Sequence, residues 1–148
     1  MTLPTAMNTP FQFPIRIYWE DTDAGGIVFY ANYLKFFERA RTEWLRALGI
    51  EQQALKTEVG GMFVVSETSL KYHRPAQLDD VLTVTAELAE GGRATLTLRQ
   101  QAWRTISGGQ TDPAPQLLAE GTIRIGWVDS STLNPGRIPA TILKALQP

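Results

Sequence analysis

The pattern of apolar and polar positions changes twice between residues 16 and 49, and each change predicts a different element. Residues 16–20 alternate basic, apolar and aromatic side chains, as a half-buried strand does. The next six residues, DTDAGG, are turn formers that tolerate unusual backbone angles. Apolar residues then recur at helical spacing, at Tyr33, Phe37, Ala40, Trp44 and Leu48. We therefore expect a strand, a turn, and an amphipathic helix that begins near Asn32 and ends with Gly49 in a left-handed cap.

The rest of the chain predicts a sheet. Residues 51–58 favour a short second helix, which Gly60 and Gly61 end. We expect strands at 62–72, 81–90, 94–105 and 117–128, with a turn at 77–80, a tight connection at 91–92, a surface loop at 106–116 and a short helix at 140–146. Short connections favour antiparallel neighbours, so this order indicates an α+β arrangement in which the sheet covers one apolar helix. The outer face and two free edges of such a sheet favour association.

Composition narrows the function classes. The chain of 148 residues is most simply one domain, 1–148, with a loose N-terminal extension at 1–12. A net charge of −1 gives no electrostatic reason to expect a nucleic-acid partner. The absence of cysteine excludes disulfides and cysteine-ligated metals and fits a reducing cytoplasm. Residues 1–14 resemble no signal or transit peptide, and no stretch approaches the roughly 20 apolar residues of a membrane span.

Two carboxylates, Asp21 and Asp23, precede the predicted helix, where unpaired backbone N–H groups favour negative charge. Gly25 and Gly26 would let a ligand approach the backbone closely. This arrangement suits attack on a carbonyl with stabilisation of the resulting oxyanion. It also suits an ordinary capped turn, so periodicity alone does not identify an enzyme.

Other chemical candidates are weaker. A calcium loop starting at Asp21 fails, because its fifth position is Gly25 and its twelfth is Asn32 instead of glutamate. His73 is the only histidine, which excludes a His-rich metal site within one chain. Arg93 follows two glycines at a turn and is a candidate for binding phosphate, although a single turn arginine is more often simply solvated. We expect no metal site.

A longer motif carries a family resemblance. Residues 18–33 read YWEDTDAGGIVFYANY, and FERAR follows at 37–41, YHRPA at 72–76 and LDD at 78–80, with a weaker match at Ile138-Pro139. In these motifs the chain resembles the 4-hydroxybenzoyl-CoA thioesterase family, and within it the Tol-Pal-associated (YbgC-type) acyl-CoA thioesterases. The resemblance covers nearly the whole chain beyond the N-terminal extension. It implies a hotdog fold, in which an antiparallel sheet wraps around one long central helix.

The resemblance also implies roles for particular residues. Asp23 corresponds to the catalytic aspartate, which either attacks the thioester carbonyl or activates a water, and Asp21 is expected to order the turn. The backbone N–H of Tyr30 matches the donor that polarises the carbonyl. Gly25, Gly26 and Phe29 are expected to contact the substrate, and Arg93 to bind the CoA phosphates. Many YbgC-type members carry histidine where this chain has Tyr30, so a histidine-assisted mechanism is in doubt here.

These expectations combine into one hypothesis: a cytoplasmic hydrolase that cleaves acyl-CoA thioesters without a metal or organic cofactor. The resemblance implies a homodimer with a continuous sheet, paired again into a homotetramer, with active sites at the subunit interface. Two alternatives stay open. One is an acyl-carrier-protein thioesterase, and the other is a non-catalytic hotdog module that binds acyl-CoA or a protein partner. The 106–116 loop is longer than usual for the family, and the sequence gives it no role.

Overall fold

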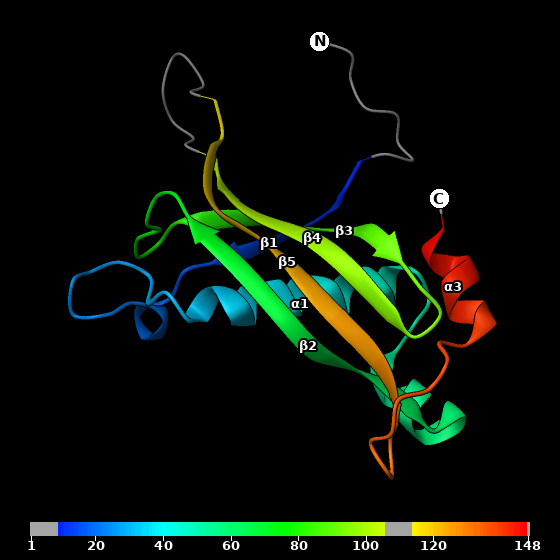
Figure 1. Ribbon diagram of the computed structural model, residues 1–148. Helices are drawn as coiled ribbons and strands as arrows, with labels where there is room; N and C mark the ends of the chain where they lie inside the picture. Colours follow the sequence, from blue (N-terminus) through cyan, green and yellow to red (C-terminus); the bar gives the residue numbers. More distant parts are fainter. Residues whose placement is uncertain (1–8, 106–113, 148) are drawn as a thin grey trace.

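The protein is a curved antiparallel sheet with one long helix against its inner face (Figure 1). The computed structural model describes residues 9–105 and 114–147. In the described residues the sheet has five strands in the order β1-β3-β4-β5-β2, and every neighbouring pair is antiparallel. Their bounds are β1 Phe11–Arg16, β2 Gly61–Tyr72, β3 Val81–Gly91, β4 Thr95–Arg104 and β5 Gln116–Asp129. This arrangement confirms the α+β class and the hotdog fold.

The long helix α1, Asn32–Ala47, begins and ends where the apolar period predicts. Tyr33, Phe37, Ala40 and Trp44 are buried against the sheet, so the helix places its apolar stripe in the core. Gly49 adopts a φ of 83°, which confirms the predicted left-handed cap. Leu48 is the exception within the stripe: it follows the last helical residue and remains 37% exposed.

Short helical elements at three places complete the fold of the described residues. A 3-10 turn, η2, spans Trp19–Asp21 before α1. The segment predicted at 51–58 consists of α2, Gln52–Ala54, and the wider helical turn η3, Leu55–Val59, and it ends at Gly60 with a φ of 81°. The C-terminal helix α3 spans Ala140–Leu146, as predicted.

The path of the chain between β2 and β3 differs from the simplest expectation. These strands are joined by a short connection, residues 73–80, which favours neighbours in the sheet. They are not neighbours, because β2 pairs with β5 and β3 lies between β1 and β4. The connection therefore crosses the ends of β5 and β4, and we call it the crossover. It passes the N-terminal end of α1, where Ala76 is fully buried.

Two other predictions are wrong at the start of the chain. The strand predicted at 16–20 lies earlier, at Phe11–Arg16, so residues 11 and 12 belong to the sheet and not to a loose extension. Alternation stops early because the carboxylate of Asp21 accepts a hydrogen bond from the Tyr18 amide, 2.8 Å, and bends the chain into η2. Residues 1–8 of the extension and 106–113 of the predicted loop lie outside the described residues.

Candidate active site

A small hairpin carries Asp23. Thr22 and Val28 form a β-bridge at its base, and the Asp23 amide donates to the Ile27 carbonyl over 2.9 Å. Gly26 closes the turn with a φ of 81°, a conformation that glycine adopts without strain. The Gly25 amide donates to Asp23 Oδ1 at 2.8 Å, while Oδ2 has no partner among the described residues. Asp23 is exposed, so one carboxylate oxygen is oriented and the other is available.

Asp21 forms hydrogen bonds that hold the local backbone together. It is buried, and its Oδ2 holds the Tyr18 amide. Its backbone carbonyl accepts hydrogen bonds from the Phe29 amide, 3.0 Å, and from the Asn32 side chain, 2.8 Å. These bonds connect η2, the hairpin and the first residue of α1. Asp21 therefore orders the turn, as the sequence indicates, and Asp23 is the exposed carboxylate of the pair.

The start of α1 presents free backbone donors. The residue before the helix, Ala31, supplies no side-chain cap. The Tyr30 N–H has no acceptor among the described residues, whereas the Tyr30 carbonyl accepts a hydrogen bond from the Tyr72 hydroxyl at 2.9 Å. An unpaired N–H at a helix start is suited to an oxygen that gains negative charge.

A cavity of about 260 Å³ adjoins this helix start. Its walls come from the hairpin, the beginning of α1 and the end of β2 with the crossover: Ile27, Val28, Tyr30, Tyr33, Tyr72, His73, Arg74 and Pro75. The walls are mainly apolar and aromatic, and burial raises the pKa of the Tyr33 hydroxyl. Asp23 does not line this cavity. Within this chain the carboxylate and the cavity are therefore adjacent features and not one enclosed site.

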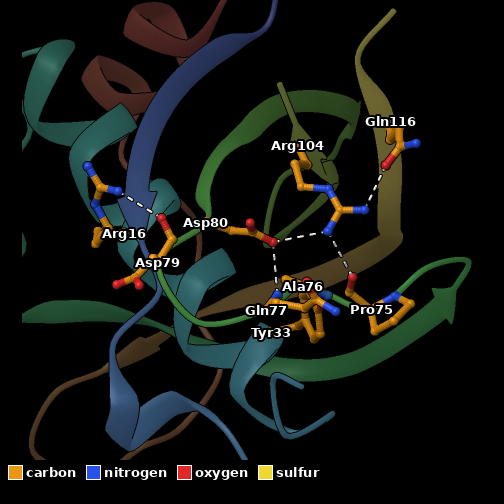
Figure 2. Close-up of polar contacts among 9 residues, drawn as sticks. All are labelled: Arg16, Tyr33, Pro75, Ala76, Gln77, Asp79, Asp80, Arg104 and Gln116. Carbon is orange, nitrogen blue, oxygen red and sulfur yellow. Dashed lines mark hydrogen bonds and ion pairs between the residues drawn. The ribbon is translucent and has the colours of Figure 1, made fainter. Parts of the chain in front are cut away.

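A polar cluster holds the crossover against the sheet (Figure 2). Arg104, the last residue of β4, donates to Asp80 Oδ2 at 3.0 Å, to the Pro75 carbonyl at 3.3 Å and to Gln116 Oε1 at 2.7 Å. The same Asp80 oxygen accepts the Gln77 amide at 2.8 Å. We call Arg104, Asp80 and Gln116 the clamp. Its members are the last residue of β4, the last residue of the crossover and the first residue of β5.

The crossover in turn supports the site. The Ala76 carbonyl accepts a hydrogen bond from the Val28 amide, 2.9 Å, and the Ala76 amide donates to the Tyr33 hydroxyl, 3.3 Å. Gln77 forms a β-bridge with Ile27. One short segment thus contacts both the hairpin of Asp23 and the first turn of α1, and it sets their relative position.

The predicted site residues fall into two places. Asp23, Gly25, Gly26, Phe29 and Tyr30 lie together at the start of α1, and the Phe29 and Tyr30 rings are 4.8 Å apart between centroids. Arg93 lies in the turn between β3 and β4, at the other end of the sheet (Figure 1). The length of β3 separates the two places by on the order of 30 Å. Arg93 and Asp23 therefore do not meet within this chain.

Sequence reasoning missed Tyr72, Asp80 and Arg104 as parts of the site. The motifs at 72–76 and 78–80 were a signal for the first two, but periodicity gave them no role. Across the described ranges, no cluster of three or more histidine, aspartate or glutamate side chains could hold a metal ion. No helix in the described part of the chain is long and apolar enough to cross a membrane.

Comparison with known proteins identifies the family. Residues 25–108 match the model of the thioesterase superfamily, and the chain therefore belongs to that superfamily. Among its relatives is the acyl-CoA thioesterase YbgC of Haemophilus influenzae, which is 39% identical over 139 residues, 94% of this chain and 96% of that protein.

Solved structures agree on the fold. A probable thioesterase from Bartonella henselae is 30% identical with a TM-score of 0.77, covering 88% of this chain and 100% of that one. The 4-hydroxybenzoyl-CoA thioesterase from a Pseudomonas strain has a TM-score of 0.81 at 24% identity, and the match covers 90% of this chain and 96% of that one. At that identity the second structure supports the fold alone.

Proposed function

We propose that this protein hydrolyses acyl-CoA thioesters to a free acid and CoA, with Asp23 as nucleophile or general base and the Tyr30 N–H as the donor to the thioester oxygen. One observation carries the assignment of roles. Among the described residues, Asp23 has an unpartnered carboxylate oxygen on a hairpin that leads directly to an uncapped helix start, where the Tyr30 N–H also lacks a partner. The family and the activity named for the Haemophilus influenzae relative support the substrate class.

Two routes use these groups. In the first, Asp23 Oδ2 attacks the thioester carbon, CoA leaves as a thiolate, and water hydrolyses the resulting mixed anhydride. In the second, Asp23 accepts a proton from a water that attacks the same carbon, and the departing thiolate then takes that proton. In both routes negative charge moves onto the carbonyl oxygen. Removing such a donor typically lowers kcat by about a hundred- to a thousandfold.

The proposed active unit is a homodimer, with two dimers forming a homotetramer. Three features support it: β2 is a free edge strand, Val65 on that strand is 50% exposed, and Asp23 does not line the cavity at the start of α1. A second copy paired along β2 would complete the cleft. In such an assembly Arg93 can meet the CoA phosphates only at the active site of another protomer. The cytoplasmic location and the absence of a cofactor stay predictions.

The decisive experiment is thiol release from a panel of benzoyl-, short-chain and long-chain acyl-CoAs by wild type and Asp23→Asn. Asparagine keeps the oxygen that accepts the Gly25 amide, so we expect an intact fold and a loss of kcat of about a thousandfold. Asp79→Asn is the matched control, because the Asp79 side chain forms no hydrogen bond or ion pair with the described residues and asparagine tolerates its φ of 73°. Activity of Asp23→Asn above a tenth of wild type would refute the assignment.

The same assay separates the alternatives. An acyl-carrier-protein thioesterase would release thiol faster from acyl-carrier protein than from the matching acyl-CoA. A non-catalytic module would bind acyl-CoA tightly and release no thiol from any member of the panel.

A further inference from the structure

Tyr72, the last residue of the edge strand β2, reaches from the sheet to the start of α1. Its hydroxyl donates a hydrogen bond of 2.9 Å to the backbone carbonyl of Tyr30. Its ring makes edge contacts with the rings of Tyr30, 6.2 Å, and Tyr33, 5.6 Å between centroids. Tyr72 therefore contacts the one residue whose backbone N–H is proposed to polarise the substrate.

The backbone around Tyr30 shows why this contact matters. In a regular helix the Tyr30 carbonyl would accept from the amide of Leu34, four residues later. Here the Leu34 amide donates to Ala31 instead, at 3.1 Å, and the Asn32 amide donates to Phe29. Among the described residues, the Tyr72 hydroxyl is the only hydrogen-bond donor to the Tyr30 carbonyl. The helix backbone thus provides no hydrogen-bond partner for either the N–H or the carbonyl of Tyr30.

We propose that Tyr72 is a positioning residue for catalysis: its hydroxyl fixes the backbone of Tyr30 so that the N–H points at the thioester oxygen. The inference rests on the proposed function and names a further residue of the same site. A donor contributes to catalysis only when it is held in place before charge develops on the oxygen. The bond from the Tyr72 hydroxyl does this from the sheet side, and the bond from the Phe29 amide to the Asp21 carbonyl does it from the hairpin side.

The environment of Tyr72 suits a donor that stays protonated. Burial and the neighbouring Tyr30 raise the pKa of its hydroxyl, so the proton is retained throughout the neutral range. Tyr72 also forms part of the wall of the cavity of about 260 Å³. The ring and the hydroxyl consequently have separable roles, the ring in shaping the cavity and the hydroxyl in holding Tyr30.

The test uses Tyr72→Phe in the full chain, with the acyl-CoA that wild type hydrolyses best. Phenylalanine keeps the ring and removes only the hydroxyl. We expect kcat to fall about tenfold, because the N–H is loosened but not lost. KM should stay within about twofold and the thermal unfolding midpoint should be unchanged, because the cavity wall remains and the lost bond is exposed. The shape of the pH–kcat profile should also be unchanged.

Two further variants separate the role of the ring from that of the hydroxyl and control for the loss of a tyrosine hydroxyl. Tyr72→Leu removes ring and hydroxyl together, so KM should rise while kcat falls as in Tyr72→Phe. Tyr18→Phe removes the hydroxyl of an exposed tyrosine that does not line the cavity, and it should match wild type in kcat and KM. The proposal is overturned if Tyr72→Phe retains wild-type kcat, if its kcat falls only together with its unfolding midpoint, or if a limb of its pH profile disappears. Should Tyr72→Phe match wild type while Asp23→Asn is inactive, the inference fails and the proposed function stands.

Discussion

Replacement of Arg104 by methionine tests whether the clamp holds the crossover. The Arg104 and Asp80 side chains are only 19% and 22% exposed, so their interaction is poorly screened by solvent. Methionine keeps an unbranched apolar stem but removes the charge and the three hydrogen bonds to Asp80, Pro75 and Gln116. The substitution also leaves the Asp80 carboxylate with the Gln77 amide as its one donor in the described structure.

The expected loss follows from these contacts. A hydrogen bond between charged groups contributes roughly 1.5–3 kcal/mol, and the longer bond to the Pro75 carbonyl contributes less. Against this, Arg104 Nε is buried without a hydrogen-bond partner among the described residues, and removing this unpaired group offsets the loss by about 1 kcal/mol. We expect Arg104→Met to lower the free energy of unfolding by about 3 kcal/mol. Activity should fall as well, because the crossover supports both the Asp23 hairpin and α1.

Urea unfolding followed by circular dichroism measures the effect, with Arg99→Met as the matched control. Arg99 lies on the same strand and pairs with Glu87 at 3.3 Å, but the two side chains are 54% and 33% exposed. Exposed pairs contribute at most about 1 kcal/mol, so the control should lose no more than that. Combining Arg104→Met with Asp80→Asn should cost less than the sum of the two single variants. Equal losses in Arg104→Met and Arg99→Met would refute the reasoning.

Two other predictions concern stability. A methyl group on Gly121 would lie 2.3 Å from the backbone oxygen of Ser69, so Gly121→Ala should lower the free energy of unfolding by about 3 kcal/mol, as measured by thermal unfolding. Gly126→Ala is the control: the nearest atom to its added methyl group would be 3.8 Å away, so this variant should resemble wild type. The amides of Thr132 and Ser131 lower the pKa of Asp129 in the folded state, so its stabilising contribution is present above about pH 4 and is lost as the pH falls through the lowered pKa. Asp129→Asn should therefore lower the urea midpoint at pH 7 and leave it nearly unchanged at pH 2; equal effects at both values would contradict this.

Local patterns in the sequence predict most of the fold. The helical period from Tyr33 to Trp44 identifies α1, and Gly49 marks its end, because both signals arise from neighbouring residues. The strand predicted at 16–20 fails for a reason that alternation does not encode: the Asp21 side chain folds back onto Tyr18. Local pattern dominates except where one side chain forms a competing hydrogen bond to the backbone.

The sequence predicts the residues of the site better than the residues that hold them in place. The hairpin and the helix start are close in sequence, so Asp23 and Tyr30 can be recognised together as parts of one motif. The side chains that hold them come from distant parts of the chain, Tyr72 and Arg104, and depend on the strand order. Strand order is a property of pairing over long separations, and one sequence read by periodicity does not reveal it. The distance between Arg93 and Asp23 is likewise set by the arrangement of the strands, which periodicity does not reveal.

The crossover links these observations. Because β2 lies beyond β5, the chain must return across the sheet to begin β3, and its path passes the first turn of α1. This path brings Tyr72 to the Tyr30 carbonyl, and Ala76 to both Val28 and Tyr33. A sheet with β2 beside β3 would need only a tight turn there and would leave the helix start without this support. The strand order that separates β2 from β3 is therefore the feature that lets a hydrogen-bonded framework surround an otherwise uncapped helix start.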